Sequence, residues 1–331
     1  MTSSRTTNAI VLKRTGGPEE LTWEPVDLPA VSSGQVLLRH TAIGFNMVDT
    51  YIRKGLYAAS LPLIPGGEAA GTIEELAADI KDFKVGDRVV YVMPPGTPGA
   101  YSERRVIEAR HLLPIPDGIS DDIAAASLLK GLTAWTLVRK TYPVKSCDTI
   151  LVYAAAGGVG SILCQWAHHI GARVIGVVGS AAKILSARQN GCTEVIDRSQ
   201  QDVVATVRKL TDGQGVPVVY DSLGKDTFEQ SLDCLRPTGL MISYGNATGA
   251  VPPVNILTLM QKGSLFLTRP QFFHYLRQPE VFQQAVGELF ELIKTGRLRV
   301  HIGRRFPLRE AAQAHAAAES TQTIGSTILL P

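Results

Sequence analysis

The feature that most constrains the fold is an alternation of apolar strand-like runs and helical segments from Thr149 to Leu267. The runs are short and almost wholly apolar, as in Ile150-Leu151-Val152-Tyr153, which is typical of parallel strands buried on both faces. We therefore predict an α/β fold with a doubly wound parallel Rossmann sheet in a domain spanning residues 128–268. The expected strands are Thr149–Ala154, Val174–Val178, Glu194–Ile196, Val218–Asp221, Leu240–Tyr244 and Ser264–Leu267.

The sequence on either side of this domain has a different pattern. Residues 1–127 contain short β-type runs separated by Gly and Pro turns such as Pro94-Pro95-Gly96, which predict a mostly β domain. Residues 269–331 contain an amphipathic helix at Pro279–Lys294 and a terminal strand at Ser326–Leu330, and we expect this segment to return to the first domain. In the first domain the expected elements are strands at Asn8–Lys13, Gln35–Ile43, Ala69–Leu76, Asp87–Val92 and Ala100–Ile107, with a helical turn at Asn46–Lys54.

Composition limits the compartment and the partners. Apolar residues make up 45% of the chain and charged residues 19%, a balance that excludes a disordered chain. The net charge of +3 is too small to indicate a nucleic-acid partner, and no apolar run approaches the roughly 18 residues of a membrane span. Four scattered cysteines and a polar N-terminal segment indicate neither a disulfide scaffold nor a secretory signal. We expect a cytoplasmic protein without a membrane or nucleic-acid partner.

The first predicted strand of the Rossmann sheet runs into a glycine-rich turn, Ala155-Ala156-Gly157-Gly158-Val159-Gly160. In a dinucleotide-binding turn one glycine lets the backbone approach the pyrophosphate, and a later glycine lets the helix pack closely on the strand. Gly157 and Gly160 occupy these positions, and Gly158 and Val159 open the helix whose free N–H groups face the phosphates. An ordinary tight turn is the alternative, but the strand and helix on either side favour dinucleotide binding.

The end of the second predicted strand indicates which dinucleotide is bound. An NAD site carries an acidic residue here for the ribose 2′-hydroxyl, whereas this chain has Gly179 and Ser180. Lys183 follows one turn later, and Arg198 follows the next strand. Lys183 alone would also suit a solvated helix position. Two cations without a carboxylate suit a 2′-phosphate, so we predict NADPH as the cofactor.

Several motifs together resemble the zinc-independent medium-chain dehydrogenases/reductases, and among them the quinone oxidoreductases of the ζ-crystallin type. The resemblance covers nearly the whole chain and implies a GroES-like fold for the first domain. In zinc-dependent members a Cys and a His stand where this chain has Asn46 and Gly67, so the ligand set that zinc needs is missing and we predict no metal. The residues that carry the resemblance are Ala42–Arg53, Lys130–Thr133, Ala154–Gly160 with Gln165, Tyr220–Ser222, Gly245-Asn246, Thr268–Pro270 and Leu329–Pro331.

The resemblance also implies the remaining site residues. Asn46 and the two tyrosines would hydrogen-bond the nicotinamide ribose or the substrate, with Tyr51 and Tyr57 flanking the substrate ring. Asp49 belongs to the same site, and the i, i+4 spacing of Asp49 and Arg53 first suggests a salt bridge within the helix. Lys130, Thr133, Ser222, Tyr244, Asn246 and Arg269 are the further residues expected to meet the cofactor, the last four near the sheet edge where α/β proteins bind ligands.

The missing metal restricts the chemistry. Hydride transfer to a simple ketone makes an alkoxide, whereas transfer to a quinone makes a phenolate-like anion that is about 7–8 kcal/mol easier to stabilise. We therefore predict an NADPH:quinone reductase that transfers hydride directly, with reduction of alkenals or enones as an alternative. A second alternative is an NADPH-binding or RNA-binding protein with little turnover, for which the basic segment Arg297–Arg305 is the candidate surface. An exposed edge strand at Ser264–Leu267 predicts a homodimer.

Overall fold

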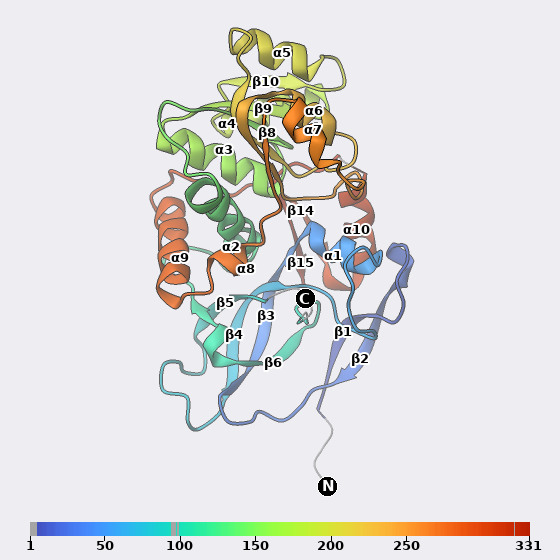
Figure 1. Ribbon diagram of the computed structural model, residues 1–331. Coiled ribbons are helices and arrows are strands. Elements are labelled where there is room, and N and C mark those ends of the chain that lie inside the picture. The colour runs from blue at the N-terminus through green and yellow to red at the C-terminus, as the bar shows by residue number, and fades with distance from the viewer. Residues whose placement is uncertain (1–4, 94–96, 98, 321) are drawn as a thin grey trace. The chain divides into compact units, whose positions relative to one another are not determined.

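The computed structural model describes residues 5–93, 97, 99–320 and 322–331, and the chain divides into two compact units. The first unit comprises Met1–Leu129 and Val300–Pro331, and the second comprises Lys130–Arg299 (Figure 1). Helix α2 (Asp121–Thr136) begins in the first unit and ends in the second. The predicted turn at Pro94-Pro95-Gly96 lies outside the described residues.

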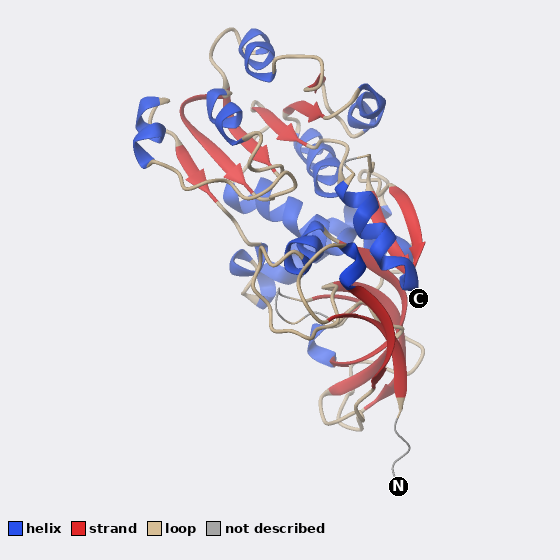
Figure 2. Ribbon diagram, turned by 90° about the vertical axis from the view of Figure 1, so that its right-hand side faces the viewer, coloured by secondary structure: helices blue, strands red, loops and turns tan. Residues whose placement is uncertain are grey.

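The second unit contains the predicted doubly wound sheet. Its described strands are all parallel and follow the order β10-β9-β8-β11-β12-β13, with helices on both faces (Figures 1 and 2). The strand order reverses between β8 and β11, and ligands bind at this point in such sheets. The strands are β8 (Thr149–Tyr153), β9 (Arg173–Val178), β10 (Glu194–Asp197), β11 (Val216–Asp221), β12 (Leu235–Ser243) and β13 (Phe266–Thr268).

Burial explains why the strands of the second unit could be recognised. All residues of β11 are buried, and Leu151, Ile175 and Val219 are fully buried members of one apolar cluster. Parallel strands covered by helices on both faces need apolar side chains at successive positions. The helices of this unit are α3 (Gly158–Ile170), α4 (Ile184–Gln189), α5 (Val203–Leu210), α6 (Phe228–Asp233), α7 (Ile256–Gln261), α8 (Phe272–Tyr275) and α9 (Pro279–Lys294).

The first unit is mostly β, as the resemblance implied. Its larger sheet has the order β14-β15-β3-β4-β5-β7, with β6 paired to β3, and its strands are strongly curved (Figure 2). The terminal strand pairs antiparallel with β3, which joins the end of the chain to this unit. Helices α1 (Met47–Arg53) and α10 (Ala311–Glu319) also belong to it. Its strands are β1 (Thr6–Leu12), β2 (Leu21–Asp27), β3 (Gln35–Phe45), β4 (Glu68–Leu76), β5 (Arg88–Val92), β6 (Arg104–Glu108), β7 (Leu113–Pro114), β14 (Ile302–Pro307) and β15 (Ser326–Leu330).

Three strands and both domain boundaries differ from the sequence-based expectation. The sequence does not predict β2, β7 or β14. The mostly exposed positions of β2 and the arginines of β14 lack a continuous apolar run, and β7 is only two residues long. The predicted boundary at 268/269 lies at 299/300, so α9 belongs to the second unit. The reason is that α9 packs on α2: Trp135 Nε1 donates to Glu288 Oε2 at 2.5 Å, and a Cβ on Gly131 would lie 2.4 Å from Leu289 Cδ2. The first boundary shifts by two residues, from 127/128 to 129/130.

Candidate functional site

The turn after β8 has the geometry of a phosphate-binding loop. Ala154 adopts φ +50° at the start of the turn, and Gly157 is the N-cap of α3. A Cβ on Gly160 would lie 2.1 Å from the carbonyl oxygen of Ala154, so only glycine allows α3 to approach the strand this closely. The first amides of the 13-residue helix, from Gly158 and Val159 onward, therefore open directly above the strand end, where an anion is favoured.

The predicted 2′-phosphate residues follow the ends of the neighbouring strands β9 and β10. Arg198 donates its backbone N–H to Val178 O at 3.0 Å, which places it beside Gly179. Nothing lies within 4 Å of a Cβ built on Gly179, so this position is open, and Ser180 follows it as the N-cap of a short 3-10 turn. Lys183 ends that turn and is half-buried, which lowers the pKa of its ammonium group. Asp197, the carboxylate that directly precedes Arg198, accepts hydrogen bonds from Ser199 N at 3.0 Å and from Ser199 Oγ at 2.7 Å.

A buried aspartate shapes the loop after β11. Asp221 is fully buried, and its carboxylate accepts from Leu223 N at 2.7 Å, Gly224 N at 3.1 Å, Thr227 Oγ1 at 2.7 Å and Ser231 Oγ at 2.7 Å. These four bonds fix the backbone around Ser222 at the edge of the sheet. A Cβ on Gly245 would lie 2.2 Å from Ser222 O, so the loops after β11 and β12 touch here.

Arg269 holds the end of β12 to the end of β13. Its Nη1 donates to Gly245 O at 2.8 Å and to both Ser243 O and Oγ at 3.2 Å. With the Asn246 amide oriented to satisfy both of its atoms, Asn246 Oδ1 accepts from Arg269 Nη2 at 2.9 Å. Tyr244, the residue between these contacts, is half-buried and bonds Asp221 O through its backbone N–H. Three residues predicted to contact the cofactor, Tyr244, Asn246 and Arg269, therefore lie close together at the ends of β12 and β13.

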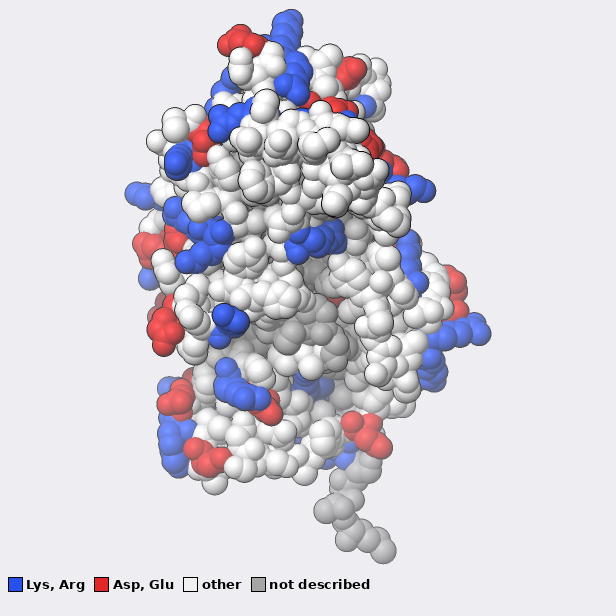
Figure 3. Space-filling view, in the orientation of Figure 1, with Lys and Arg blue, Asp and Glu red and all other residues white. Residues whose placement is uncertain are grey.

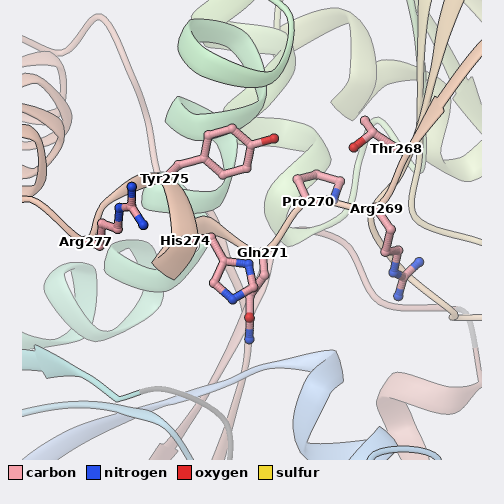
Figure 4. Close-up of a pocket in the computed structure, with 7 residues that line it drawn as sticks. All are labelled: Thr268, Arg269, Pro270, Gln271, His274, Tyr275 and Arg277. Carbon is pink, nitrogen blue, oxygen red and sulfur yellow. The ribbon is translucent and has the colours of Figure 1, made fainter.

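An open pocket continues from this cluster along the chain. Figure 4 shows Arg269 and Arg277 at opposite ends of its wall, with Tyr275 between them. The residues that line the pocket are Thr268, Arg269, Pro270, Gln271, His274, Tyr275 and Arg277.

The predicted cofactor residues Lys130 and Thr133 are not among them. They lie one turn apart on α2, where Lys130 is 5% exposed and Thr133 is half-buried.

In the first unit, Asn46 contacts a buried glutamate. Asn46 is the N-cap of α1 and is 5% exposed, and its Nδ2 donates to Glu68 Oε2 at 2.9 Å and to Gly44 O at 3.3 Å. Glu68, at the start of β4, is fully buried, and its Oε1 accepts from Leu129 N at 2.6 Å. A Cβ on Gly44 would lie 2.4 Å from Glu68 Oε2, so glycine at this position makes room for the carboxylate.

A second buried network of hydrogen bonds contacts the first turn of α1 through Asp49. Asp49 Oδ2 accepts from Asn46 N at 3.0 Å and from Tyr101 OH at 3.1 Å, and Tyr101 OH lies 3.2 Å from His315 Nε2. Because Tyr101 donates to the aspartate, His315 must donate through Nε2–H. Burial lowers the pKa of His315 to about 3, with a contribution from Arg53, and burial raises the pKa of Tyr101 well above its usual value.

The predicted salt bridge of Arg53 involves a different partner. Arg53 is fully buried, and its Nη2 donates to Glu319 at the end of α10. Glu319 also lies 3.3 Å from Lys54 Nζ. The salt bridge therefore connects α1 with α10, two helices far apart in the sequence. The expected partner of Arg53 was Asp49, within α1 itself.

The two tyrosines of the predicted site contact each other. The rings of Tyr51 and Tyr57 meet edge to face, with centroids 5.4 Å apart and planes inclined at 68°. A ring held between two aromatic faces needs a separation of about 7 Å, twice the usual contact distance. No ring fits between the two tyrosines in this arrangement, and the expectation that they flank a substrate ring stays a prediction.

In the part of the chain that the structure describes, the charged side chains form no metal cluster, and the face drawn in Figure 3 shows no single basic surface. Among the described residues, no group of three or more His, Cys, Asp and Glu side chains could hold a metal ion. The segment Arg297–Arg305 is divided between the two units, and Arg305 Nε lies 3.2 Å from Asp122 Oδ2. On the face drawn in Figure 3, Lys and Arg are interspersed with Asp and Glu. This face offers no support for a nucleic-acid surface.

Sequence reasoning missed Glu68, Tyr101 and His315. Glu68 begins an otherwise mostly apolar strand and follows two glycines, and an acid in such a place was the available signal. No motif in the sequence around Tyr101 or His315 indicates a role, because each forms its hydrogen bonds with residues more than 50 positions away.

Comparisons with known proteins extend over the whole chain. Residues 32–117 match the family model of the alcohol dehydrogenase GroES-like domain, and residues 158–291 match that of the zinc-binding dehydrogenases. A quinone oxidoreductase from Pseudomonas aeruginosa is 49% identical over 96% of this chain and 97% of its own. A 2-haloacrylate reductase from a Burkholderia species is 44% identical over 98% of each chain. The crystal structure of Escherichia coli quinone oxidoreductase complexed with NADPH superposes with a TM-score of 0.94 and 44% identity, covering 98% of this chain and 100% of that one. None of the helices described here is both long and apolar enough to span a bilayer.

Proposed function

Because the chain belongs to the medium-chain dehydrogenase/reductase family, we propose that it is an NADPH-dependent quinone reductase. NADPH, when bound, supplies the hydride that reduces the quinone. The observation that carries the proposal is the dinucleotide turn at Ala155–Gly160 combined with a β9 end that offers a cation and no carboxylate. The protein's own residues bind and orient the two reactants.

The second unit supplies the cofactor contacts in this proposal. The amides at the start of α3 face the pyrophosphate, and Gly179 and Ser180 leave space for the adenosine ribose. Lys183 and Arg198 neutralise the 2′-phosphate. The four hydrogen bonds of Asp221 keep the loop at Ser222 rigid, and Arg269 holds Asn246 in place. Tyr244, Lys130 and Thr133 complete the set of contacts.

The donor set of the first unit suits an acceptor whose product anion is delocalised. Asn46 and Gly67 stand at the positions where zinc-dependent relatives carry ligands, and neither binds zinc. Ordinary donors such as Tyr51 and Tyr57 can stabilise a phenolate-like anion, which is about 7–8 kcal/mol less demanding than an alkoxide. A quinone therefore fits these residues better than a simple ketone does.

A second candidate acceptor is an activated alkene. The 2-haloacrylate reductase shares 44% identity over 98% of both chains, and a conjugated alkene also receives hydride to give a delocalised anion. Oxidation of NADPH should be followed with 1,4-benzoquinone, with 2-chloroacrylate and with a 2-alkenal in parallel. Turnover with the quinone at least tenfold above the other two supports quinone reduction. The reverse order supports the alkene, and no turnover with any acceptor contradicts both.

Lys183 provides a test of cofactor choice. We expect Lys183→Ala to weaken NADPH binding about tenfold or more, because a charge-assisted contact to the 2′-phosphate contributes about 1.5–3 kcal/mol. NADH binding should stay unchanged, since NADH lacks that phosphate. Arg188→Ala, at an exposed position on α4, is the matched control. Equal effects of Lys183→Ala on both cofactors would contradict the assignment.

We also propose a cytoplasmic homodimer formed along strand β13. This strand is an edge of the sheet, and Phe266 on it is 62% exposed. Ile256 and Met260 on α7 are 76% and 61% exposed, and Leu265 N bonds Leu259 O at 2.9 Å, which ties this helix to the strand. An exposed edge with apolar neighbours favours pairing with a second copy. Light scattering should give a dimeric mass that Phe266→Glu reduces to a monomeric one, and a monomeric wild-type protein would contradict the proposal.

The proposed cytoplasmic location is supported by the cysteines of the chain, which are all free thiols, as is usual in a reducing compartment.

A further inference from the structure

We propose that Asn46 meets a bound ligand only as a hydrogen-bond acceptor, and that Glu68 is the positioning residue that fixes this polarity. The inference rests on the proposed function and refines it. It assigns Asn46 to a donor group, such as a hydroxyl of the nicotinamide ribose, and removes it from the groups that stabilise the reduced quinone.

The argument begins with the hydrogens of the Asn46 amide. A carboxamide nitrogen carries two hydrogens, and its oxygen only accepts. One hydrogen is donated to Glu68 Oε2 at 2.9 Å and the other to Gly44 O at 3.3 Å. Both hydrogens are therefore used within the first unit. Oδ1 faces the backbone N–H of Asp49 as the acceptor of the capping box of α1, and its second lone pair is the acceptor that remains for a ligand.

Glu68 keeps the amide from turning over. Its side chain is fully buried, and Leu129 N donates to Oε1 at 2.6 Å while Gly44 leaves room for Oε2. An ionised carboxylate can only accept. Reversing the Asn46 amide would place Oδ1 against Oε2, two acceptors in a buried site, and would leave the carboxylate without one of its donors, a loss of about 1–3 kcal/mol.

If Asn46 only accepts, other residues must supply the hydrogen-bond donors that a quinone needs. The oxygen of a quinone gains negative charge as it is reduced, so it needs hydrogen-bond donors. Asn46 Oδ1 would repel that oxygen, whereas a ribose hydroxyl can donate to it. The donors for the acceptor must then come from other groups, among which the hydroxyls of Tyr51 and Tyr57 are the candidates.

A pair of substitutions can reverse this polarity without changing shape. In Glu68→Gln the Leu129 amide still requires an acceptor, so the new amide oxygen faces Leu129 and its nitrogen faces Asn46. Asn46 must then turn its oxygen toward position 68 and present N–H to the ligand. We expect the dissociation constant for NADPH to rise about tenfold, which corresponds to one lost hydrogen bond.

The double variant Asn46→Asp with Glu68→Gln restores an acceptor. One oxygen of the new carboxylate accepts from the glutamine nitrogen, and the other faces the ligand. The dissociation constant should return to within about threefold of the wild type, and kcat with 1,4-benzoquinone should recover with it. Asn46→Asp alone sets two carboxylates against each other and should bind NADPH worse than the double variant.

NADPH binding is measured by fluorescence titration without a quinone, and kcat is measured separately. If the double variant binds NADPH normally but its kcat falls about 50-fold, Asn46 is a donor to the quinone and the proposal is wrong. An unchanged dissociation constant in Glu68→Gln would also overturn it. Glu75→Gln, at the exposed end of the same strand, controls for the loss of a carboxylate from β4.

A measurement on the wild type covers the case in which Glu68→Gln does not fold. Two NADPH analogues, each lacking one hydroxyl of the nicotinamide ribose, are compared with NADPH. One of them should bind about tenfold more weakly to the wild type and no more weakly than NADPH to Asn46→Ala. Equal binding of all three to the wild type would overturn the inference. If the wild type binds no NADPH at all, the proposed function itself is wrong.

Discussion

The dinucleotide turn of the second unit and the Asn46 cluster of the first unit are built in opposite ways. The turn consists of the consecutive residues 154–160, and its essential groups are backbone amides and missing side chains. The cluster comprises Asn46, Glu68 and the Leu129 amide. In this cluster and the adjoining Asp49–Tyr101–His315 network, hydrogen-bonded groups are 22, 61 and 214 positions apart. A site made of backbone can be recognised in a short stretch of sequence. A site made of buried side chains becomes visible only when the chain is folded.

The largest effect is expected in the turn itself. Gly160→Ala would place a Cβ 2.1 Å from Ala154 O, and α3 must move away from the strand. We expect NADPH binding to fall at least 100-fold and the free energy of unfolding to fall by about 3 kcal/mol. Titration with NADPH and urea denaturation measure the two quantities.

A helix glycine without close neighbours serves as the control. Nothing lies within 4 Å of a Cβ built on Gly287 of α9, so Gly287→Ala should bind NADPH normally and be slightly more stable. If Gly160→Ala binds NADPH as well as Gly287→Ala does, the turn is an ordinary connection between strand and helix.

The buried network of the first unit should make stability depend on pH. The pKa of His315 is about 3 in the folded chain and 6.5 in the unfolded chain, so the unfolded chain binds the proton first as pH falls. The stabilisation is complete above pH 6.5 and declines as pH falls toward 3. Between pH 6.5 and pH 5 the loss from this group is about 2 kcal/mol.

Urea midpoints at pH 6.5 and pH 5 measure this loss in the wild type and in His315→Gln. The glutamine amide can still donate to Tyr101 but does not titrate, so the variant should lose about 2 kcal/mol less than the wild type over this interval. His40, whose pKa is lowered by burial to about 4, contributes in the same direction in both proteins. Identical pH dependence in the two proteins would show that His315 is not buried as described.

The smallest of these effects concerns a single hydroxyl. Tyr101→Phe removes the donor to Asp49 and leaves His315 Nε2–H without its acceptor. We expect a loss of about 1.5 kcal/mol in the free energy of unfolding. Tyr142→Phe, at a partly exposed position, should cost less than about 0.5 kcal/mol. Equal costs would mean that the Asp49–Tyr101–His315 network does not stabilise α1.

The site residues divide in the same way between local and long-range origin. The spacing after two apolar strands predicts Gly157, Gly160, Gly179 and Lys183. Gly157 is the N-cap of α3, Gly160 lies in the first turn of that helix, Gly179 directly follows β9, and Lys183 ends the next 3-10 turn. Arg53 was assigned to Asp49 by helical spacing, but it pairs with Glu319, because α10 reaches α1 only in the folded unit. The contact between Tyr51 and Tyr57 also depends on the path of the chain after α1.

The doubly wound sheet and its glycine turn could be predicted from residue order alone, because burial on two faces and close backbone approach each restrict residue types within a few consecutive positions. The folded chain was needed to find the contacts of Asn46 with Glu68, those of Glu68 with Leu129, and the membership of α9 in the second unit. These depend on which distant groups become neighbours. A hydrogen bond between residues 22 or more positions apart leaves no periodicity in the chain.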